Sequence, residues 1–195
     1  MDESAHDPGG KRAFPLPGGV TGDALFDGPD ACYRYAATYQ NGLHRGPRRR
    51  LMVVGMNPST ATHQQFDPTV AKLWRLAMRM SFSDLLMTNV YAYRATDPKG
   101  LRHVDDPAGV YNRTTLDTLG AQADMILMAH GEPKTKAFAA EAFWIRELFL
   151  QRGYPMFILQ LTRNGWPAHP LYLKNSLQPV PWDGRTIKNP PKLPD

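Results

Sequence analysis

The chain has 195 residues, of which 42% are hydrophobic, and a formal net charge of +5. A core of this size needs neither disulfides nor metals, and the single cysteine, Cys32, excludes a disulfide framework, a zinc site of several cysteines and a four-cysteine iron–sulfur cluster from this chain alone. No run reaches the ~18 consecutive apolar residues of a membrane span, so we expect a soluble protein of the reducing cytoplasm without a membrane partner.

The two ends of the chain differ in composition from its middle. Residues 1–30 are rich in Gly, Pro and Asp, and residues 183–195 are polar and rich in Pro. Neither segment has an apolar pattern that buries a face, so both are expected to be flexible. The intervening residues 31–182 are expected to form one domain.

Residues 32–40 alternate aromatic and polar side chains, which is typical of a strand with one exposed face. Asn41 and Gly42 then favour a tight turn back toward Arg50, so a hairpin is expected at the edge of a sheet. The basic triplet Arg48–Arg50 is more typical of a solvated strand edge than of a nucleic-acid grip. The positive charge of the whole chain is nevertheless compatible with a polyanion partner.

Residues 51–55 form an apolar run that stops at the polar sequence Met56-Asn57-Pro58-Ser59. Gly and Pro at its end indicate a buried strand that leads into a loop. In an open α/β sheet this loop lies at the carboxyl end of the strand, where ligands bind, so Asn57 is a candidate for chemistry. An Asx-type turn that only stabilises the backbone is the alternative.

Helix and strand signals alternate through the rest of the chain. Asp67 and Pro68 are typical of a helix cap and a first helical residue. An apolar stripe with helical spacing follows at Val70, Leu73, Trp74, Ala77 and Met78. Further helices are expected over residues 107–120 and 134–151, and further strands over 85–91, 125–129 and 156–161. Right-handed crossovers then predict a three-layer α/β/α sandwich around a mostly parallel four-stranded sheet.

Polar residues follow each expected strand, at the edge where the loops of a parallel sheet converge on a pocket. They are Asn57, Ser59, Thr60 and Asp67; Asn89, Tyr91 and Arg94; His130; and residues 162–171. Each has a structural alternative. Asp67 caps a helix, Asn89 satisfies neighbouring backbone groups, Tyr91 packs, and Arg94 pairs with Asp97 on the surface. His130 has no second ligand at metal spacing, so we expect neither a metal nor a cofactor.

Two resemblances rest on these motifs. Residues 32–182 resemble a bacterial and phage family, domain-of-unknown-function family 1643, in four motifs: Asn-Pro-Ser-Thr (57–60), Asp-Pro-Thr (67–69), Ala-Tyr-Arg-Ala-Thr-Asp-Pro (92–98) and His-Pro-Leu-Tyr (169–172). More remotely, Gly55-Met56-Asn57-Pro58 resembles the water-positioning motif of the uracil-DNA glycosylase superfamily, most closely its single-strand-selective and mismatch-specific branches. Asn89 and His169-Pro170 stand in the order of that superfamily's base-reading asparagine and histidine loop.

The second resemblance implies a uracil-DNA-glycosylase-like fold and a protein that flips a modified or damaged DNA base into a pocket and hydrolyses its N-glycosidic bond. Asn57 would orient the water through its side-chain carbonyl, and His169 would donate to the base oxygen as negative charge builds there. Asn89 would read the base edge, and Phe66 would stack on the base. The remaining implied substrate-binding residues are Gly55, Met56, Pro58, Ser59, Tyr91, Arg94, His130, Pro170 and Tyr172.

The chain departs from the superfamily pattern at two places. Ser59-Thr60 replaces the small residue after Asn-Pro, and Leu171-Tyr172-Leu173 replaces the polar residue after His-Pro. A bulkier base, or binding of modified DNA without turnover, is as compatible with these residues as uracil excision, and Asp67 is an alternative general base. An enzyme that acts on a free nucleotide or nucleoside is a third hypothesis. Dinucleotide binding, phosphoryl transfer and serine hydrolysis are disfavoured because their loop motifs are missing.

Overall fold

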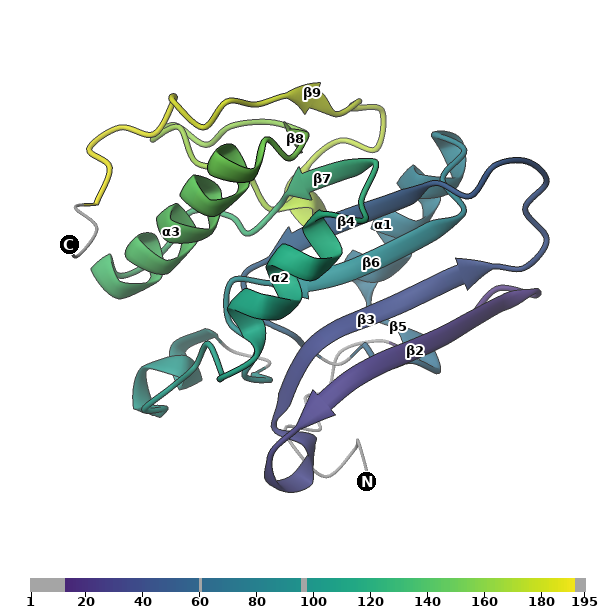
Figure 1. Cartoon of the computed structure of the whole chain (residues 1–195), viewed down its shortest axis with the longest axis horizontal. Helices are drawn as coiled ribbons and strands as arrows, with labels where there is room; N and C mark the ends of the chain where they lie inside the picture. The colour runs from purple at the N-terminus through teal and green to yellow at the C-terminus, as the bar shows by residue number, and fades with distance from the viewer. Residues whose placement is uncertain (1–12, 60, 96–97, 192–195) are drawn as a thin grey trace.

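A computed structural model describes residues 13–59, 61–95 and 98–191 of the chain. The described residues form an α/β fold around a mixed, seven-stranded sheet (Figure 1). In spatial order the strands are β2 (Val20–Asp27), β3 (Tyr33–Asn41), β6 (Asp84–Asn89), β4 (Arg50–Gly55), β7 (Met125–Met128), β8 (Met156–Ile158) and β9 (Val180–Pro181). A separate short pair joins β1 (Phe14–Pro15) to β5 (Gln65–Phe66).

The four strands expected from the sequence are the parallel centre of the sheet. β6, β4, β7 and β8 are parallel neighbours, and β6 and β7 are buried along their whole length. A strand covered on both faces reads as a continuous apolar run, which is why these four segments stand out in the sequence. The expected four-stranded sheet is nevertheless wrong, because β2 and β3 extend one side and β9 the other, all in antiparallel pairings.

The N-terminal region corrects two expectations. β3 pairs with β2 on one side and with β6 on the other, so residues 32–40 do not lie at the edge and do not form a hairpin with Arg50. β2 is the edge strand, and it lies inside the segment that was expected to be flexible. Its side chains alternate between half-buried and exposed, and this weak pattern, interrupted by Gly22 and Asp23, conceals the strand.

The C-terminal segment is also partly ordered. Ile187 is 7% exposed and packs with Trp182 in a buried cluster, and Trp182 Nε1 donates to Thr186 Oγ1 at 3.0 Å. The expectation that residues 183–195 are flexible is therefore wrong for this part. Single apolar anchors in a polar, Pro-rich segment produce no periodic signal.

Helices cover both faces of the sheet. α1 (Pro68–Arg79) packs on one face, whereas α2 (Asn112–Gly120) and α3 (Lys136–Arg152) pack on the other, as Figure 1 shows. α1 begins as expected, with Asp67 Oδ1 accepting from the Val70 N–H at 2.8 Å. α2 begins five residues later than expected, after a turn in which Gly109 has φ +79°. Three short 3₁₀ helices complete the fold: η1 (Pro29–Ala31), η2 (Pro98–His103) and η3 (Pro170–Tyr172).

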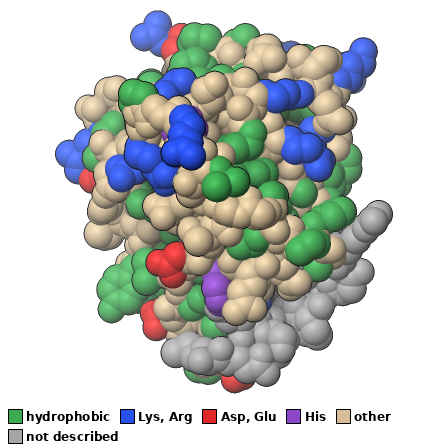
Figure 2. Space-filling view, turned by 90° about the vertical axis from the view of Figure 1, so that its right-hand side faces the viewer, with side chains coloured by type: hydrophobic (Ala, Val, Ile, Leu, Met, Phe, Trp, Pro, Cys, Tyr) green, Lys and Arg blue, Asp and Glu red, His purple; other side chains and the backbone are tan. Residues whose placement is uncertain are grey.

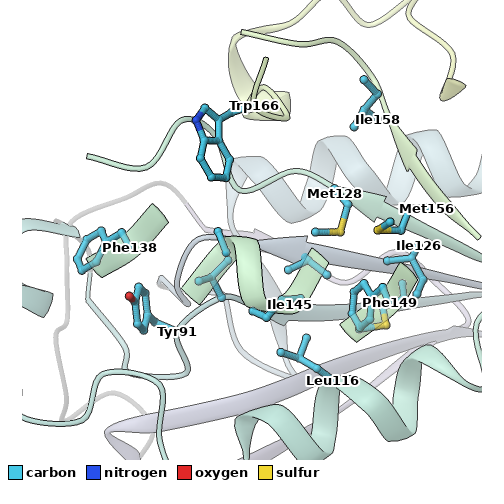
Figure 3. Close-up of a cluster of buried hydrophobic side chains, with 14 of the residues drawn as sticks. Tyr91, Leu116, Ile126, Met128, Phe138, Ile145, Phe149, Met156, Ile158 and Trp166 are labelled. Carbon is cyan, nitrogen blue, oxygen red and sulfur yellow. The ribbon is translucent and has the colours of Figure 1, made fainter. Parts of the chain in front are cut away.

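The larger buried cluster lies between the sheet and the α2–α3 face. It joins Ile126 and Met128 of β7 to Leu116, Ile145 and Phe149 of the two helices (Figure 3). Burial of a side chain of this size stabilises the fold by roughly 1.5–3 kcal/mol. The packed core therefore holds the strand ends that position the loops. None of the helices in the described ranges has the length and apolar character needed to cross a membrane.

The arginine triplet lies at the amino-terminal edge of the parallel strands. Arg48 and Arg50 pair with the carboxylate of Asp84, which is 1% exposed, and the Arg49 guanidinium lies 4.4 Å from the centroid of the Phe82 ring. Figure 2 looks onto this side of the molecule, where Lys and Arg side chains gather. The triplet therefore flanks the start of β4, as expected, and its role as something other than a nucleic-acid grip stays a prediction.

Candidate functional site

The loops at the carboxyl ends of the parallel strands surround a cavity of about 670 Å³. This volume lies within the range of small-molecule sites. Its wall contains most of the residues singled out from the sequence: Gly55, Met56, Asn57, Ser59, Asp67, Asn89, His130, His169 and Tyr172. The loop after β4, the end of β6, the loop after β7 and the segment around η3 thus meet at one place, together with the first turn of α1.

Five predicted site residues do not line this cavity. Phe66 is 3% exposed and packs between the rings of Tyr39 and Trp74, with centroid distances of 4.9 and 5.8 Å. This position does not fit stacking on a base, and it arises because β5 directs the ring into the core beside α1. Pro58 and Pro170 are buried residues of their loops.

Tyr91 and Arg94 also have structural surroundings. Tyr91 packs on Phe138, its hydroxyl donates to Ala137 O at 3.2 Å, and burial raises its pKa. Arg94 is 3% exposed, donates from Nη1 to Ala31 O at 3.0 Å and lies over the Phe26 ring. These contacts explain the side chains without a ligand. Asp97, the partner suggested for Arg94, and Thr60 lie outside the described residues.

Asn57 is held by the backbone in one orientation. Its Nδ2 donates to Pro58 O at 3.0 Å and to Ala95 O at 2.6 Å, which uses both amide hydrogens. Ala95 lies in the loop after β6, so the bond joins two of the loops that form the cavity. In an Asx turn the side-chain oxygen would instead accept from the backbone two residues on. The observed contacts use both amide hydrogens and leave Oδ1 as the acceptor of a side chain that lines the cavity.

Asn89 lies at the end of β6, next to Gly55 on β4. Its side chain is nearly buried, and its Nδ2 has no hydrogen-bond partner among the described residues. The main chain beneath it is fixed by Asn112 of α2, whose Nδ2 donates to Asn89 O at 3.2 Å and to Val90 O at 2.8 Å. A buried amide donor without a partner is unusual in a folded protein and is available to a ligand.

The two histidines of the cavity have different hydrogen-bonding surroundings. His130 Nδ1 lies 2.7 Å from Gly131 O, so the proton is on Nδ1 and Nε2 is an acceptor. Burial lowers the pKa of His130 to about 4, so the ring is neutral at pH 7. His169 Nδ1 accepts from the Leu171 N–H at 3.3 Å, which places the proton of its neutral ring on Nε2. His130 therefore offers an acceptor at Nε2, and His169 offers a donor at Nε2 from a neighbouring loop.

Asp67 combines a structural contact with a place on the cavity wall. It is 6% exposed, and one carboxylate oxygen caps α1. A cap of this kind stabilises a helix by ~1 kcal/mol. The helix-cap interpretation is thus confirmed, and the role of Asp67 as an alternative general base stays a prediction.

Several residues of the wall were missed from the sequence. They include Arg34 of β3, Met87 of β6, Phe138 of α3, and Glu132 and Lys134 of the loop after β7. Arg34 gave no signal, because residues 32–40 alternate like a strand with one exposed face, where a charged residue is expected. Glu132 accepts from Asn164 Nδ2 at 2.6 Å, and this bond lowers the pKa of Glu132. Within the described ranges no three His, Cys, Asp or Glu side chains gather into a metal-binding group.

Comparison with known proteins gives one result. Residues 39–171 match the model of a family described as "Protein of unknown function (DUF1643)". Searches of curated proteins and of solved structures found no match. The matched residues include the ends of all four parallel strands and every loop of the cavity up to Leu171. The chain therefore belongs to the DUF1643 family.

Proposed function

We propose that this protein is a DNA glycosylase-like enzyme that binds a flipped, modified or damaged base in the cavity and hydrolyses its N-glycosidic bond. In this proposal the fold is a three-layer α/β/α sandwich of the uracil-DNA-glycosylase type. The observation that carries the proposal is Asn57. Its amide nitrogen is committed to Pro58 O and Ala95 O, so its oxygen is presented as a fixed acceptor.

Each reacting group needs a matching contact. The glycosidic bond breaks with its electron pair on the base, and the sugar becomes an electron-poor oxocarbenium ion that water attacks. Asn57 Oδ1 would orient this water, and because an amide cannot take its proton, the proton would pass to the departing base anion or to the solvent. His169, with the proton of its neutral ring on Nε2, would donate to the base oxygen as negative charge develops. Asn89, with its unpartnered Nδ2, would bind the base edge.

A row of cations beside the cavity favours a polymer over a free nucleoside. Lys72, Arg75 and Arg79 have the i, i+3, i+7 spacing of one helix face on α1, and Lys174 follows η3. We call these four residues the basic stripe. None of the stripe's members forms an ion pair within the part of the chain that the structure describes.

The basic stripe is continuous with the cavity. Lys72, Arg75 and Lys174 line a groove of about 440 Å³ whose wall includes Leu171 and Leu173, and these two leucines also line the cavity. Tyr172, at the cavity mouth, is 84% exposed. Exposed apolar and aromatic side chains of this kind stack on bases or wedge between them, and unpaired cations bind phosphates.

The test is base release from a panel of oligonucleotides that contain uracil, hydroxymethyluracil or hypoxanthine, in single and double strands, followed by alkali to cut abasic sites. We expect the wild type to release one of these bases, and we expect Asn57→Ala and His169→Ala to lose this activity. His44→Ala is the matched control, because His44 lies in the loop before β4, at the opposite edge of the sheet. A gel shift without base release would instead indicate a reader of modified DNA. The proposal is overturned if the protein neither releases a base nor retains the oligonucleotide in a gel shift.

A further inference from the structure

Arg34 is a buried cation on the cavity wall, and none of the described residues supplies a counter-charge to it. Arg34 is 2% exposed, and its Nη1 donates to Ala61 O. Its Nε is buried and has no hydrogen-bond partner, and the guanidinium forms no ion pair within residues 13–59, 61–95 and 98–191. Buried charges are normally paired or fully hydrogen-bonded, so a third partner is expected for this group.

A β-bulge places Arg34 at this position. The pairing of β2 with β3 passes from Leu25 opposite Ala36 to Phe26 opposite Arg34, so Tyr35 is an extra residue. Ala37 and Tyr39 face α1, whereas Tyr35 lies beside Gly109 on the α2 side. The extra residue shifts the alternation of β3 side chains between the two faces of the sheet. As a result, the Arg34 side chain lies on the α1 side, where it contacts Ala61. Bulges commonly re-aim a side chain beside a functional site.

A second unpartnered donor lines the same cavity. Asn89 Nδ2 is buried and makes no hydrogen bond with any described residue. The carboxylates of the wall do not balance Arg34: Asp67 caps α1, Glu132 accepts from Asn164, and neither forms an ion pair with the guanidinium. The cavity wall thus contains two buried donors, Arg34 Nε and Asn89 Nδ2, that have no acceptor among the described residues.

We propose that Arg34 and Asn89 form an oxyanion subsite that binds a phosphate or carboxylate group of the ligand. Guanidinium groups bind both oxyanions through two parallel N–H bonds, and a bond to a charged acceptor is about twice as strong as a neutral one. The proposal rests on the proposed function only for the nucleotide part of the ligand. A base that carries a carboxylate keeps Asn89 at the base edge, as proposed above, whereas a nucleotide phosphate in the subsite would replace that contact of Asn89.

Calorimetric titration of the full chain distinguishes these sources. The ligands are deoxyuridine, deoxyuridine 5′-monophosphate and 5-carboxydeoxyuridine. We expect one of the two anionic ligands to bind at least about tenfold more tightly than deoxyuridine, and its identity reveals whether phosphate or carboxylate occupies the subsite. Equal affinity for all three ligands, or no binding of any, would overturn the proposal. This comparison uses the unaltered protein and does not depend on the folding of a variant.

Variants then test the residue itself. Arg34→Gln should weaken binding of the anionic ligand by much more than binding of deoxyuridine and so remove the preference, and Arg34→Lys should restore part of the preference. If Arg34 only holds the loop through Ala61 O, Arg34→Gln will weaken all ligands equally, and the proposal fails. If the anionic ligand binds more tightly but no base is released from oligonucleotides, the oxyanion subsite stands and the glycosylase function fails. If a base is released but the anionic ligand binds no more tightly than deoxyuridine, the glycosylase function stands and the oxyanion subsite fails.

Discussion

Asn89 fills the space that a side chain on Gly55 would occupy. The two residues are register partners on β6 and β4, and Asn89 Oδ1 lies 2.8 Å from the position of a Cβ built on Gly55. Gly55→Ala must therefore displace the end of the Asn89 side chain. We expect base release to fall by roughly 100-fold, because small misplacements of a binding group have effects of this size. The free energy of unfolding should change by less than about 1 kcal/mol.

Gly18→Ala is the matched control for this substitution, since a Cβ at Gly18 meets no atom within 4 Å. Kinetics and urea denaturation of the two variants separate a change in the site from a loss of folding. If Gly55→Ala releases the base as fast as the wild type does, the position of Asn89 is unimportant for base release. A large loss of stability would show that the neighbouring strand moves instead.

Asp67→Asn separates the helix cap from a general base. Asparagine caps helices about as well as aspartate, so the free energy of unfolding should stay within about 0.5 kcal/mol of the wild type, whereas Asp67→Ala should lose ~1 kcal/mol. In our proposal the water is oriented by Asn57, and Asp67→Asn should keep base release within about threefold. Turnover and denaturation curves of both variants provide the measurement. A loss of turnover by several orders of magnitude in a stable Asp67→Asn protein would identify Asp67 as the base.

The sequence predicts the centre of this fold better than its edges. Four apolar runs indicate β4, β6, β7 and β8 because a strand buried on both faces must be apolar throughout. The Asp67-Pro68 signal predicts the start of α1 to the residue. β2 is missed because an exposed edge strand needs only one apolar face. Ile187 is missed because one buried side chain in a polar segment has no period.

The site was predictable where it follows from strand ends. Asn57, Asn89 and His130 each follow a buried run, and parallel strands bring their ends together. Arg34 was missed because its position depends on a bulge in an antiparallel pairing with β2, which the sequence does not reveal. Phe66 shows the opposite error: an aromatic residue near a loop faces the core when its short strand packs on α1.

His130 should make stability depend on pH. Burial lowers its pKa from the ordinary value of 6.5 to about 4 in the folded protein, and nearby His169 adds to this effect. Between these two values the unfolded chain binds more protons, so stability falls as pH decreases from 6.5 to 4. At pH 5 the loss should be about 2 kcal/mol relative to pH 8. Urea denaturation of the wild type and of His130→Asn at both pH values isolates this contribution. Parallel pH dependences of the two proteins would contradict it.

The basic stripe should determine how DNA binding responds to salt. Lys72 and Arg79 also donate to the main-chain oxygens of Leu173 and Asn175, so Arg75 and Lys174 are the cleaner positions to change. Each of Arg75→Gln and Lys174→Gln should reduce the slope of log binding constant against log salt by about 1, because one fewer phosphate is neutralised. Arg45→Gln is the matched control, since Arg45 is exposed in the loop before β4 at the opposite edge. Fluorescence anisotropy of a labelled oligonucleotide over a salt series gives the slopes. If Arg45→Gln changes the slope as much as the stripe variants do, the cations near the cavity have no special role, and the DNA contacts the protein elsewhere.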